Sequence, residues 1–401
     1  MTVPGPGPCD VLVVGTGPAG NSAAITCARV GLKVLQIERE TLPRPKTCGG
    51  GLSPKALQAL PIPIDPVIER RIEAVWVCSG PDRAVLKMLK KPGAMVCRER
   101  FDHFMAEAAQ AAGSHLRTGC AFLGFEREPK GLLRVATSEG EVLTRMLVGA
   151  DGVHSQVRKS LYPEGKRVSV PALEARVTPR PLVLAALGNM ALIDFEAIEG
   201  GYGWIFPKAD HLNVGLYRLL RTGHNTDLLH LFQRFVASNP LLRDGRIEGL
   251  RGYQIPIRPV SSTLTEGPVL LVGDAAGLGE AFYGEGICFA VQSGCKAGEY
   301  IAANLLGGAS LGAYSTWARR LRRDLFLTRL TAHLFYRMPG FGFDWMVRNP
   351  FVNELFAGVV AGEVSAGRCL GLTALGAPAW LWQQRHPTAA LTHLIPGLLE
   401  I

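Results

Sequence analysis

The chain has 401 residues and a formal net charge of +9; 47% of its residues are hydrophobic and 19% are charged. A chain this apolar and this sparsely charged is not disordered, and its length predicts two or three packed domains. The 47 glycines and 27 prolines follow no repeat period, which excludes collagen-like and solenoid folds. The nine cysteines show no C-x-x-C spacing and no Cys/His cluster, so we expect no metal site, no disulfide scaffold and a reducing, cytoplasmic location.

No segment has the pattern of a targeting sequence or a membrane span. The Pro/Gly-rich start, Met1–Asp10, lacks the basic and apolar regions of a secretory signal. The nearest candidate span, Cys369–Trp382, contains Pro378 and is shorter than the ~18 apolar residues that a transmembrane helix needs. We therefore predict no transmembrane helix.

A glycine-rich turn joins the first predicted strand to the first predicted helix. The apolar run Val11–Val14 predicts a buried parallel strand, and Ser22–Val30 predicts a helix that ends at Gly31. Between them stands the G-x-G-x-x-G pattern Gly15-Thr16-Gly17-Pro18-Ala19-Gly20. This context is typical of a dinucleotide-binding βαβ unit, in which the N-terminus of the helix binds a pyrophosphate.

The three glycines of this pattern have separate roles. Gly15 allows the tight turn, Gly17 lets the backbone approach the pyrophosphate, and Gly20 lets helix and strand pack closely. Together with Pro18 and Ala19 they form the predicted phosphate site.

An acidic residue ends the second predicted strand. Val34–Ile37 is again a short apolar run, and Glu38 follows it, eighteen positions after Gly20. A carboxylate there can accept hydrogen bonds from both hydroxyls of an adenosine ribose, which favours FAD or NAD over NADP. We place Glu38 and the adjacent Arg39 among the nucleotide-binding residues.

The remaining elements predict a nucleotide-binding domain that a second sheet interrupts. In chain order they are a loop over 43–52, short strands between Val75 and Met95, a helix over Phe101–Ala112, a strand at Met146–Val148, an antiparallel sheet over about 170–265 with a helix near 226–237, a strand at Val269–Val272, a helix from near Gly286, and helices after about 312. We predict an α/β fold in three parts. A discontinuous Rossmann-like domain covers 1–75, 97–165 and 266–325, an inserted antiparallel β-sheet substrate domain covers 76–96 and 166–265, and a helical C-terminal region covers 326–401.

Three later motifs separate FAD from NAD. Arg98–Asp102, Gly149–Arg158 and Gly273–Gly277 follow the glycine-rich turn in order. The set resembles the fingerprints of FAD-dependent oxidoreductases of the aromatic-hydroxylase type, with a glutathione-reductase-like FAD domain. That resemblance implies that Arg98 lies beside the pyrophosphate or adenosine of FAD. It also implies that Asp151, with Gly152, helps to close the nucleotide fold, and that Asp274, with Gly273, binds the ribityl chain or pyrophosphate. The alternative for Arg98 and Asp102 is a solvated helix start.

Three further stretches narrow the family. Pro45–Leu57, which contains Cys48-Gly49-Gly50-Gly51, Tyr202–Lys208 and Gly284-Glu285-Gly286-Ile287 resemble motifs of the geranylgeranyl reductase family of flavoproteins. Members of this family saturate isoprenoid double bonds in archaeal lipids, chlorophyll side chains or menaquinone tails. The resemblance implies an FAD-dependent reductase acting on a polyprenyl or similar lipid-like substrate. It adds Cys48, Gly49, Gly50, Gly284, Gly286 and Ile287 to the FAD-binding residues.

Such a reaction needs a hydride from flavin N5 on one alkene carbon and a proton on the other. Cys48 and Tyr202 are the candidate proton donors or positioning groups, and Glu280 is a weaker one; a buried, inert role for Cys48 is the alternative. Tyr202, Trp204 and Phe206 alternate along a predicted strand and therefore share one face. This aromatic face would either line a substrate tunnel or pack the sheet against a helix.

Other activities on the same scaffold stay open at this point. A monooxygenase or halogenase is one alternative, although Tyr202–Pro207 only partly matches a halogenase W-x-W-x-I-P pattern. The family usually has Asp-Pro where this chain has Glu280-Ala281, which leaves the substrate and the flavin's position less defined. An electron-transfer flavoprotein that reduces quinone is another alternative, although no cysteine cluster provides an iron–sulfur site.

The C-terminal third combines arginines with apolar residues. Arg319–Arg323 precedes Leu325-Phe326-Leu327, and aromatic residues such as Phe341 and Trp345 follow. This pattern fits an interfacial helix on anionic lipid, hence possible peripheral membrane contact, or an ordinary helix with solvated arginines. The basic run is too short to indicate nucleic-acid binding. Because the chain has one dinucleotide pattern, the external reductant (NADPH, NADH or reduced ferredoxin) is left open.

Overall fold

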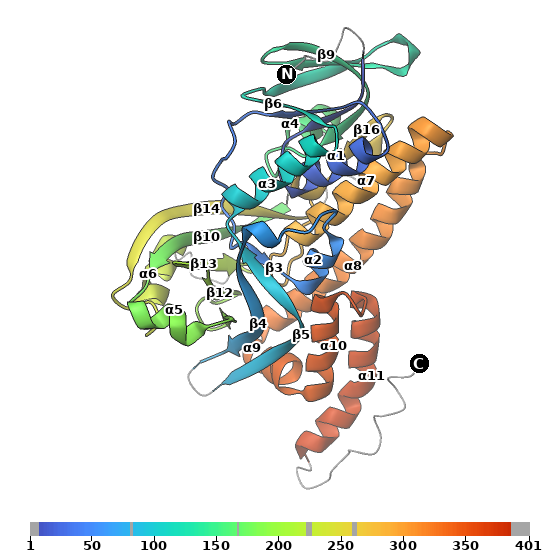
Figure 1. Ribbon diagram of the computed structural model, residues 1–401. Coiled ribbons are helices and arrows are strands. Elements are labelled where there is room, and N and C mark those ends of the chain that lie inside the picture. Colours follow the sequence, from blue (N-terminus) through green and yellow to red (C-terminus); the bar gives the residue numbers. More distant parts are fainter. Residues whose placement is uncertain (1–7, 81–82, 167, 222–226, 259–262, 386–401) are drawn as a thin grey trace.

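The computed structural model describes residues 8–80, 83–166, 168–221, 227–258 and 263–385 (Figure 1). Its first sheet, sheet A, has five parallel strands in the order β16 (Val269–Leu271), β9 (Gly140–Gly149), β1 (Cys9–Val14), β2 (Val34–Glu38) and β6 (His115–Thr118). Three antiparallel strands extend it: β15 (Thr265–Glu266), β7 (Phe122–Arg127) and β8 (Leu133–Thr137). Val11–Val14 of β1 and all of β16 are continuous apolar runs and are buried, as is usual for parallel strands.

Three helices belong to this first layer: α1 (Pro18–Arg29), α3 (Arg98–Ala111) and α7 (Ile287–Gly307). α1 and α7 lie side by side (Figure 1), and glycine at 294 permits this approach, since a Cβ there would lie 2.1 Å from the Ala19 carbonyl oxygen. The helix expected to start at Ser22 starts at Pro18. Proline suits the first helical turn because its φ is preset and its missing N–H is not needed there.

The second sheet, sheet B, carries most of the middle of the chain. Its order is β14 (Arg246–Arg258), β10 (Val168–Thr178), β13 (Leu212–Arg218), β12 (Gly201–Pro207), β11 (Met190–Asp194), β4 (Ile68–Cys78), β5 (Ala84–Val96) and β3 (Gly51–Leu52). The expected antiparallel sheet is correct for every pair except β11 with β4, which run parallel. The short strands expected from Val75 to Met95 are two long strands, the first of which starts at Ile68.

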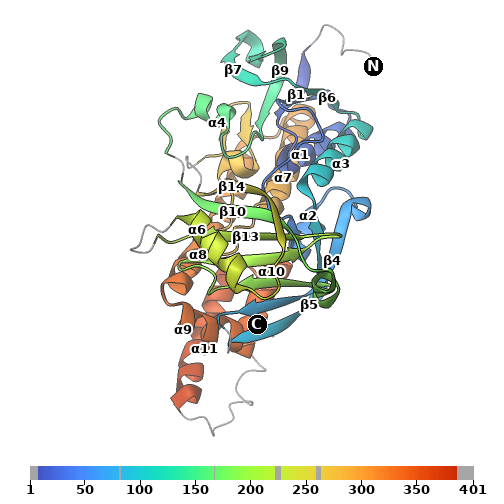
Figure 2. The ribbon, with the colours of Figure 1, turned by 90° about the vertical axis from the view of Figure 1, so that its left-hand side faces the viewer.

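The two faces of sheet B pack against different helices. α5 (Pro181–Leu187) and α6 (Leu228–Ser238) cover one face, where Leu192 and Ile205 pack against Phe232 and Phe235 (Figure 2). On the other face, Tyr202 and Tyr217 belong to an aromatic cluster with Phe335 of the C-terminal helices. Since β-strand side chains alternate, this second face carries the residues that sequence analysis assigned to the substrate.

The C-terminal region is helical, as predicted, up to Arg385, and residues 386–401 of the predicted region lie outside the described residues. It consists of α8 (Gly312–Arg337), α9 (Pro339–Phe343), a π-helical turn over Asp344–Arg348, α10 (Pro350–Ala361) and α11 (Ala366–Arg385). Shorter elements are α2 (Pro54–Ala59), α4 (Gln156–Leu161) and the 3-10 turns Asp65–Val67, Pro129–Gly131 and Gly273–Ala276. Among the described helices, none has the length and apolarity needed to cross a membrane.

Replacing Gly294 with alanine tests the contact between α1 and α7. We expect Gly294→Ala to lower the free energy of unfolding by about 1–3 kcal/mol, because the added methyl overlaps backbone that has to move. Gly307→Ala on the same helix is the matched control, because a Cβ there meets no atom within 4 Å. The control should be neutral or stabilising by up to about 1 kcal/mol. Equal effects in urea unfolding would contradict the close contact.

Candidate functional site

A cavity of about 970 Å³ is lined by residues of both sheets and of the C-terminal helices. Nineteen of the residues that sequence analysis proposed lie on its wall. They are Gly15, Gly17, Pro18, Ala19, Glu38, Arg39, Cys48, Gly49, Gly50, Arg98, Asp151, Gly152, Tyr202, Trp204, Phe206, Asp274, Gly284, Gly286 and Ile287. Gly20 and Gly273 are not among the lining residues: a Cβ at Gly20 would lie 2.0 Å from the Gly15 carbonyl oxygen, and one at Gly273 would lie 2.9 Å from Ala19 Cβ. These two glycines serve the packing of α1.

The glycine-rich turn leaves room for a ligand at the N-terminus of α1. Gly15 has a φ of 102° and no space for a side chain, because a Cβ would lie 2.6 Å from the Ala150 carbonyl oxygen. Gly17 borders open space, and as the N-cap of α1 it offers no side-chain hydrogen bond to the first turn. The first N–H groups of the helix therefore face the cavity and suit a phosphate.

Glu38 is buried and already held by donors. Its Oε2 accepts hydrogen bonds from the backbone N–H of Thr16 (3.1 Å) and from the Thr16 hydroxyl (2.8 Å), and Arg44 Nη2 lies 3.2 Å away. Burial opposes ionisation, but Arg44 and the Thr16 donors together hold the pKa of Glu38 below its usual value. Glu38 is thus an ionised acceptor on the cavity wall.

Arg98 and Asp102 form a bidentate pair within α3, with two N···O distances of 2.8 Å. Asp102 is fully buried, so the alternative of a solvated helix start is wrong for it. Arg44 Nη1 also lies 3.4 Å from Asp102 Oδ2 and so joins Asp102 to Glu38. Sequence analysis missed Arg44, since nothing in the loop around it distinguishes one arginine from another.

Asp274 lies in a second polar cluster. Its Oδ2 accepts a hydrogen bond from the Tyr253 hydroxyl at 2.9 Å, and Lys46 Nζ lies 3.2 Å from the centre of the Tyr253 ring. Burial first, and then repulsion by Arg98, lowers the pKa of Lys46 to about 8. Lys46 and Tyr253 line the cavity but were missed, because the first lies in a loop and the second on a strand of ordinary composition.

Among the described residues, one carboxylate oxygen of Asp151 accepts hydrogen bonds and the other accepts none. Oδ2 accepts from the backbone N–H groups of Gln156 (2.6 Å) and Val157 (3.2 Å) and so caps α4. Oδ1 is buried and accepts no hydrogen bond from the residues that the structure describes. Burial raises the pKa of this carboxyl. An acceptor of this kind on a cavity wall fits a ligand that brings hydroxyl donors.

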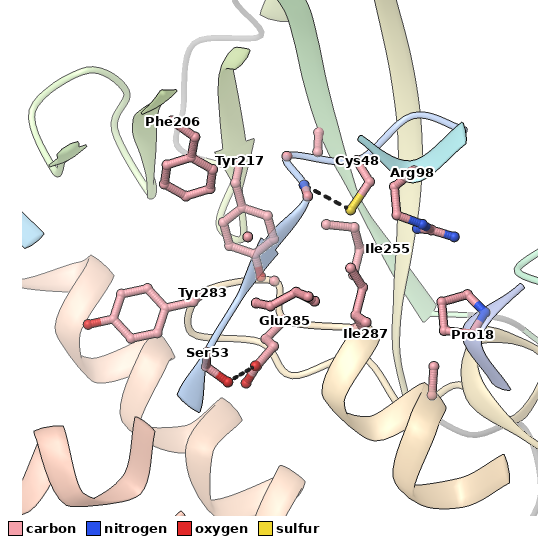
Figure 3. A pocket seen from close by; sticks show the side chains of 18 of the residues that line it. Pro18, Cys48, Ser53, Arg98, Phe206, Tyr217, Ile255, Tyr283, Glu285 and Ile287 are labelled. Atoms are coloured by element: carbon pink, nitrogen blue, oxygen red, sulfur yellow. Dashed lines mark hydrogen bonds between the residues drawn. The ribbon is translucent and has the colours of Figure 1, made fainter. Parts of the chain in front are cut away.

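These features together fit FAD. An uncapped helix N-terminus suits the diphosphate, Glu38 suits the adenosine ribose, and Asp274 and Asp151 suit further hydroxyls. The N-terminus of α7 at Gly286 likewise has no side-chain cap and borders the same cavity (Figure 3).

The loop that carries Cys48 is fixed by sheet B. The backbone N–H of Cys48 donates to Glu174 Oε1 at 2.8 Å, and Glu174 Oε2 accepts from Asn213 Nδ2 at 2.8 Å. Asn213 Oδ1 in turn accepts from Trp204 Nε1 at 2.7 Å. Within the loop, the N–H of Gly50 points to Cys48 Sγ at 3.4 Å (Figure 3). Glu174 and Asn213 were missed, because their strands carry other polar residues and nothing local distinguishes these two.

Lys208 supports the same loop from the other side. Its side chain is buried, so bulk solvent is not its partner. Its Nζ donates to the carbonyl oxygens of Gly49 (2.7 Å) and Val96 (3.0 Å). Burial lowers the pKa of Lys208 to about 8. The neutral amine of Lys208 still carries two N–H bonds, one for each of these two carbonyl oxygens.

The aromatic residues of β12 form one wall of the cavity. Tyr202, Trp204 and Phe206 have neighbouring ring centroids 6.0 and 6.1 Å apart. Phe206 covers the glycine loop, where a Cβ at Gly49 would lie 3.2 Å from the ring. The Tyr202 hydroxyl donates to the Tyr283 carbonyl, and burial raises its pKa well above the usual value. Both expected roles therefore apply: these rings line the cavity and pack the sheet.

Glu280 is a structural residue in this arrangement. Its two oxygens accept from the backbone N–H groups of Phe282 and Tyr283. It does not line the cavity, whereas its neighbour Glu285 does and accepts a hydrogen bond from Ser53.

Comparison with known proteins also indicates that the chain binds FAD. A family model described as an FAD binding domain matches residues 8–192. The chloroplastic geranylgeranyl diphosphate reductase of Oryza sativa subsp. japonica is 32% identical over 337 residues, which cover 78% of this chain and 70% of that protein. Digeranylgeranylglycerophospholipid reductase 1 of Methanothermobacter thermautotrophicus is 31% identical, with 77% and 82% covered.

A solved structure shares the fold. The geranylgeranyl bacteriochlorophyll reductase-like protein of Thermoplasma acidophilum superposes with a TM-score of 0.72 at 23% identity, and the match covers 90% of this chain and 93% of that one.

The shifted pKa of Lys208 gives a prediction about stability. The unfolded chain keeps the lysine proton up to about pH 10.5, whereas the folded protein releases it above about pH 8. The free energy of unfolding of the wild type should therefore rise from about pH 8 to 10 relative to that of Lys208→Met. Lys46 is present in both proteins, so its own titration cancels. Parallel pH profiles would contradict the assignment.

The cavity thus holds the predicted FAD-binding residues in one place, and FAD is the cofactor of this enzyme. With relatives above 30% identity over more than three quarters of its length, the chain belongs to the geranylgeranyl reductase family of FAD-dependent oxidoreductases.

Proposed function

We propose that this oxidoreductase saturates carbon–carbon double bonds of a geranylgeranyl or similar polyprenyl chain. The observation that carries the proposal is the apolar part of the cavity, which continues from the Cys48 loop. Its lining residues Val75, Val77, Val85, Ile193, Val347, Phe356 and Val360 come from sheet B and the C-terminal helices. An unbranched polar substrate would leave these groups without partners, whereas a prenyl chain buries apolar surface against them. The names of the relatives support the same substrate class.

Different residues of this chain would supply the proton, exclude water and orient the substrate. Bound FAD supplies the hydride. The hydroxyl of Tyr202 donates its hydrogen bond to the Tyr283 carbonyl. Both oxygens of Glu280 accept hydrogen bonds from backbone N–H groups. Neither side chain is therefore placed to give a proton to the substrate. Cys48 lies on the cavity wall with its backbone held by Glu174, and we assign its Sγ as the proton donor. The aromatic wall excludes water and orients the chain.

An anaerobic assay tests the function directly. The enzyme's flavin is reduced chemically, a geranylgeranyl lipid is added, and flavin reoxidation is followed by absorbance while mass spectrometry measures the gain of two hydrogens per double bond. Reoxidation coupled to product supports the proposal. Reoxidation only by oxygen, with unchanged lipid, would favour a monooxygenase or halogenase instead.

Cys48→Ala should lower the rate of lipid-dependent reoxidation by about 10²–10⁴-fold, the usual contribution of a positioned general acid. Flavin content should stay near the wild-type value, because the backbone groups of the loop remain. Cys295→Ala, at a half-buried cysteine outside the cavity wall, is the control and should keep full activity. A fully active Cys48→Ala enzyme would remove Cys48 as the proton donor.

We also propose that the outer face of α8 contacts an anionic membrane. Phe326, Leu330 and Leu334 are 53%, 48% and 55% exposed and stand four residues apart, hence on one face. Exposed arginines flank this apolar stripe at 319, 320, 323 and 337. Apolar side chains between cationic ends are the pattern of a helix that lies in a lipid interface.

The triple variant Phe326→Ser/Leu330→Ser/Leu334→Ser should bind phosphatidylglycerol vesicles about tenfold more weakly, or worse, in cosedimentation. The control is Leu123→Ser/Leu182→Ser/Leu306→Ser, three leucines that are 65%, 81% and 65% exposed elsewhere. Equal binding by both variants would contradict a role for α8.

A further inference from the structure

The loop over residues 280–285 is largely buried, although it contains neither helix nor strand. It follows the 3-10 turn Gly273–Ala276 and leads through Gly286 into α7. Ala281 and Phe282 are only 1% and 2% exposed. Loops usually lie at the surface, where water satisfies their backbone polar groups, so a buried loop needs partners within the protein.

Three tyrosine hydroxyls, from three different elements, donate to three successive carbonyl oxygens of this loop. The pairs are Tyr217 of β13 with Ala281 (2.6 Å), Tyr336 of α8 with Phe282 (2.7 Å) and Tyr202 of β12 with Tyr283. All three tyrosines are at most 5% exposed. A buried tyrosine hydroxyl needs a hydrogen-bond partner, and here every partner belongs to the same loop. We call these three side chains the tyrosine clamp.

Glu280 adds further hydrogen bonds from within the loop. Its carboxylate accepts from the N–H groups of Phe282 and Tyr283, and its own N–H donates to the carbonyl oxygen of Glu285 at 2.9 Å. The three carbonyls of residues 281–283 and two of their N–H groups therefore have partners. Side chains hold the loop at Ala281, where no proline restricts φ.

The loop also connects the aromatic wall of the cavity with the N-terminus of α7. Phe282 and Tyr283 line the cavity, as do the next four residues, 284–287, which include the uncapped start of α7 (Figure 3). A Cβ at Gly286 would lie 3.5 Å from Asp274 Oδ1, so this end of the loop borders a residue that fits FAD. A shift of the 281–283 backbone would therefore move the start of α7 relative to the cofactor.

We propose that Tyr202, Tyr217 and Tyr336 are positioning residues for the cofactor, because their hydroxyls hold the 281–283 backbone so that residues 284–287 are preformed for FAD. Without one of these hydroxyls a buried carbonyl loses its donor, and the loop gains conformations in which that carbonyl reaches another partner or water. A ligand is held more weakly when only a fraction of the molecules has the competent conformation. This inference rests on FAD binding and not on the reaction proposed above.

Tyr336→Phe tests the clamp most directly. Tyr336 does not line the cavity, so its hydroxyl acts on FAD only through the Phe282 carbonyl. The release of FAD from the purified holoenzyme is followed by the gain of flavin fluorescence after dilution. We expect release from the variant to be about tenfold faster than from the wild type. The visible circular dichroism of the bound flavin should also change, because the loop borders the cofactor.

Tyr314→Phe is the matched control. Tyr314 lies on the same helix, is fully buried, and donates to the carbonyl oxygen of Leu271 at 3.0 Å, but it is not part of the cavity wall. Each variant loses one buried hydrogen bond of the same kind, so a general loss of stability would speed FAD release in both. We expect Tyr314→Phe to release FAD at close to the wild-type rate and to keep the flavin spectrum.

Tyr217→Phe gives an independent measurement, because it removes the donor of the neighbouring Ala281 carbonyl. It should also speed FAD release, and the double variant Tyr217→Phe/Tyr336→Phe should release FAD faster than either single variant. Equal release rates from Tyr336→Phe and Tyr314→Phe, whether both fast or both unchanged, would overturn the proposal. No lipid enters these measurements, so a failure of the proposed reaction would leave their outcome unchanged.

Discussion

The hydrogen bond from the Cys48 backbone to Glu174 is the link on which the arrangement of the site depends. The loop around Cys48 leaves β2 of sheet A, yet Glu174, Asn213 and Trp204 belong to three strands of sheet B. One chain of hydrogen bonds therefore positions a loop that follows a strand of sheet A against three strands of sheet B. Because even a half-buried carboxylate is costly without donors, this network holds its partners in place.

Buried cations surround the same loop and give it a second constraint. Lys208 holds the Gly49 carbonyl, and Lys46 lies against Tyr253 close to Asp274. Burial lowers the pKa of both lysines to about 8, so each is near its titration point under mildly alkaline conditions. Arg44 pairs with the buried carboxylate of Glu38, and Arg98 with that of Asp102. These cations and carboxylates largely balance each other, so the uncapped N-terminus of α1 remains the feature that suits a diphosphate.

Residues whose roles depend on local geometry could be predicted from the sequence. Residues that act through partners far away in the chain could not. The glycine-rich turn, Glu38 and the alternating aromatic residues of β12 act through local geometry, so their spacing was enough to place them. Lys208, Glu174 and Glu280 act through partners that only the tertiary fold defines. Lys208 reaches Gly49 across 159 positions and Glu174 reaches Cys48 across 126, and no local pattern encodes such a contact. For that reason Glu280 was a possible acid from the sequence alone. Gly20 packs the helix closely, as its place in the glycine pattern predicts, and the packing of Gly273 against Ala19 depends on the tertiary fold.

The single parallel pair in sheet B has a consequence for how the protein is made. β4 and β5 are synthesised early, but β4 pairs with β11, more than a hundred residues later in the chain. Until β11 emerges, the hairpin exposes an open strand edge, and on its outer side Trp76, Leu86 and Met88 are 42%, 59% and 61% exposed even in the folded protein. Edges of this kind promote intermolecular pairing, and long-range pairing slows folding. The wall of the cavity is therefore completed late, after β11 has been synthesised, and β4 presents an unpaired edge until then.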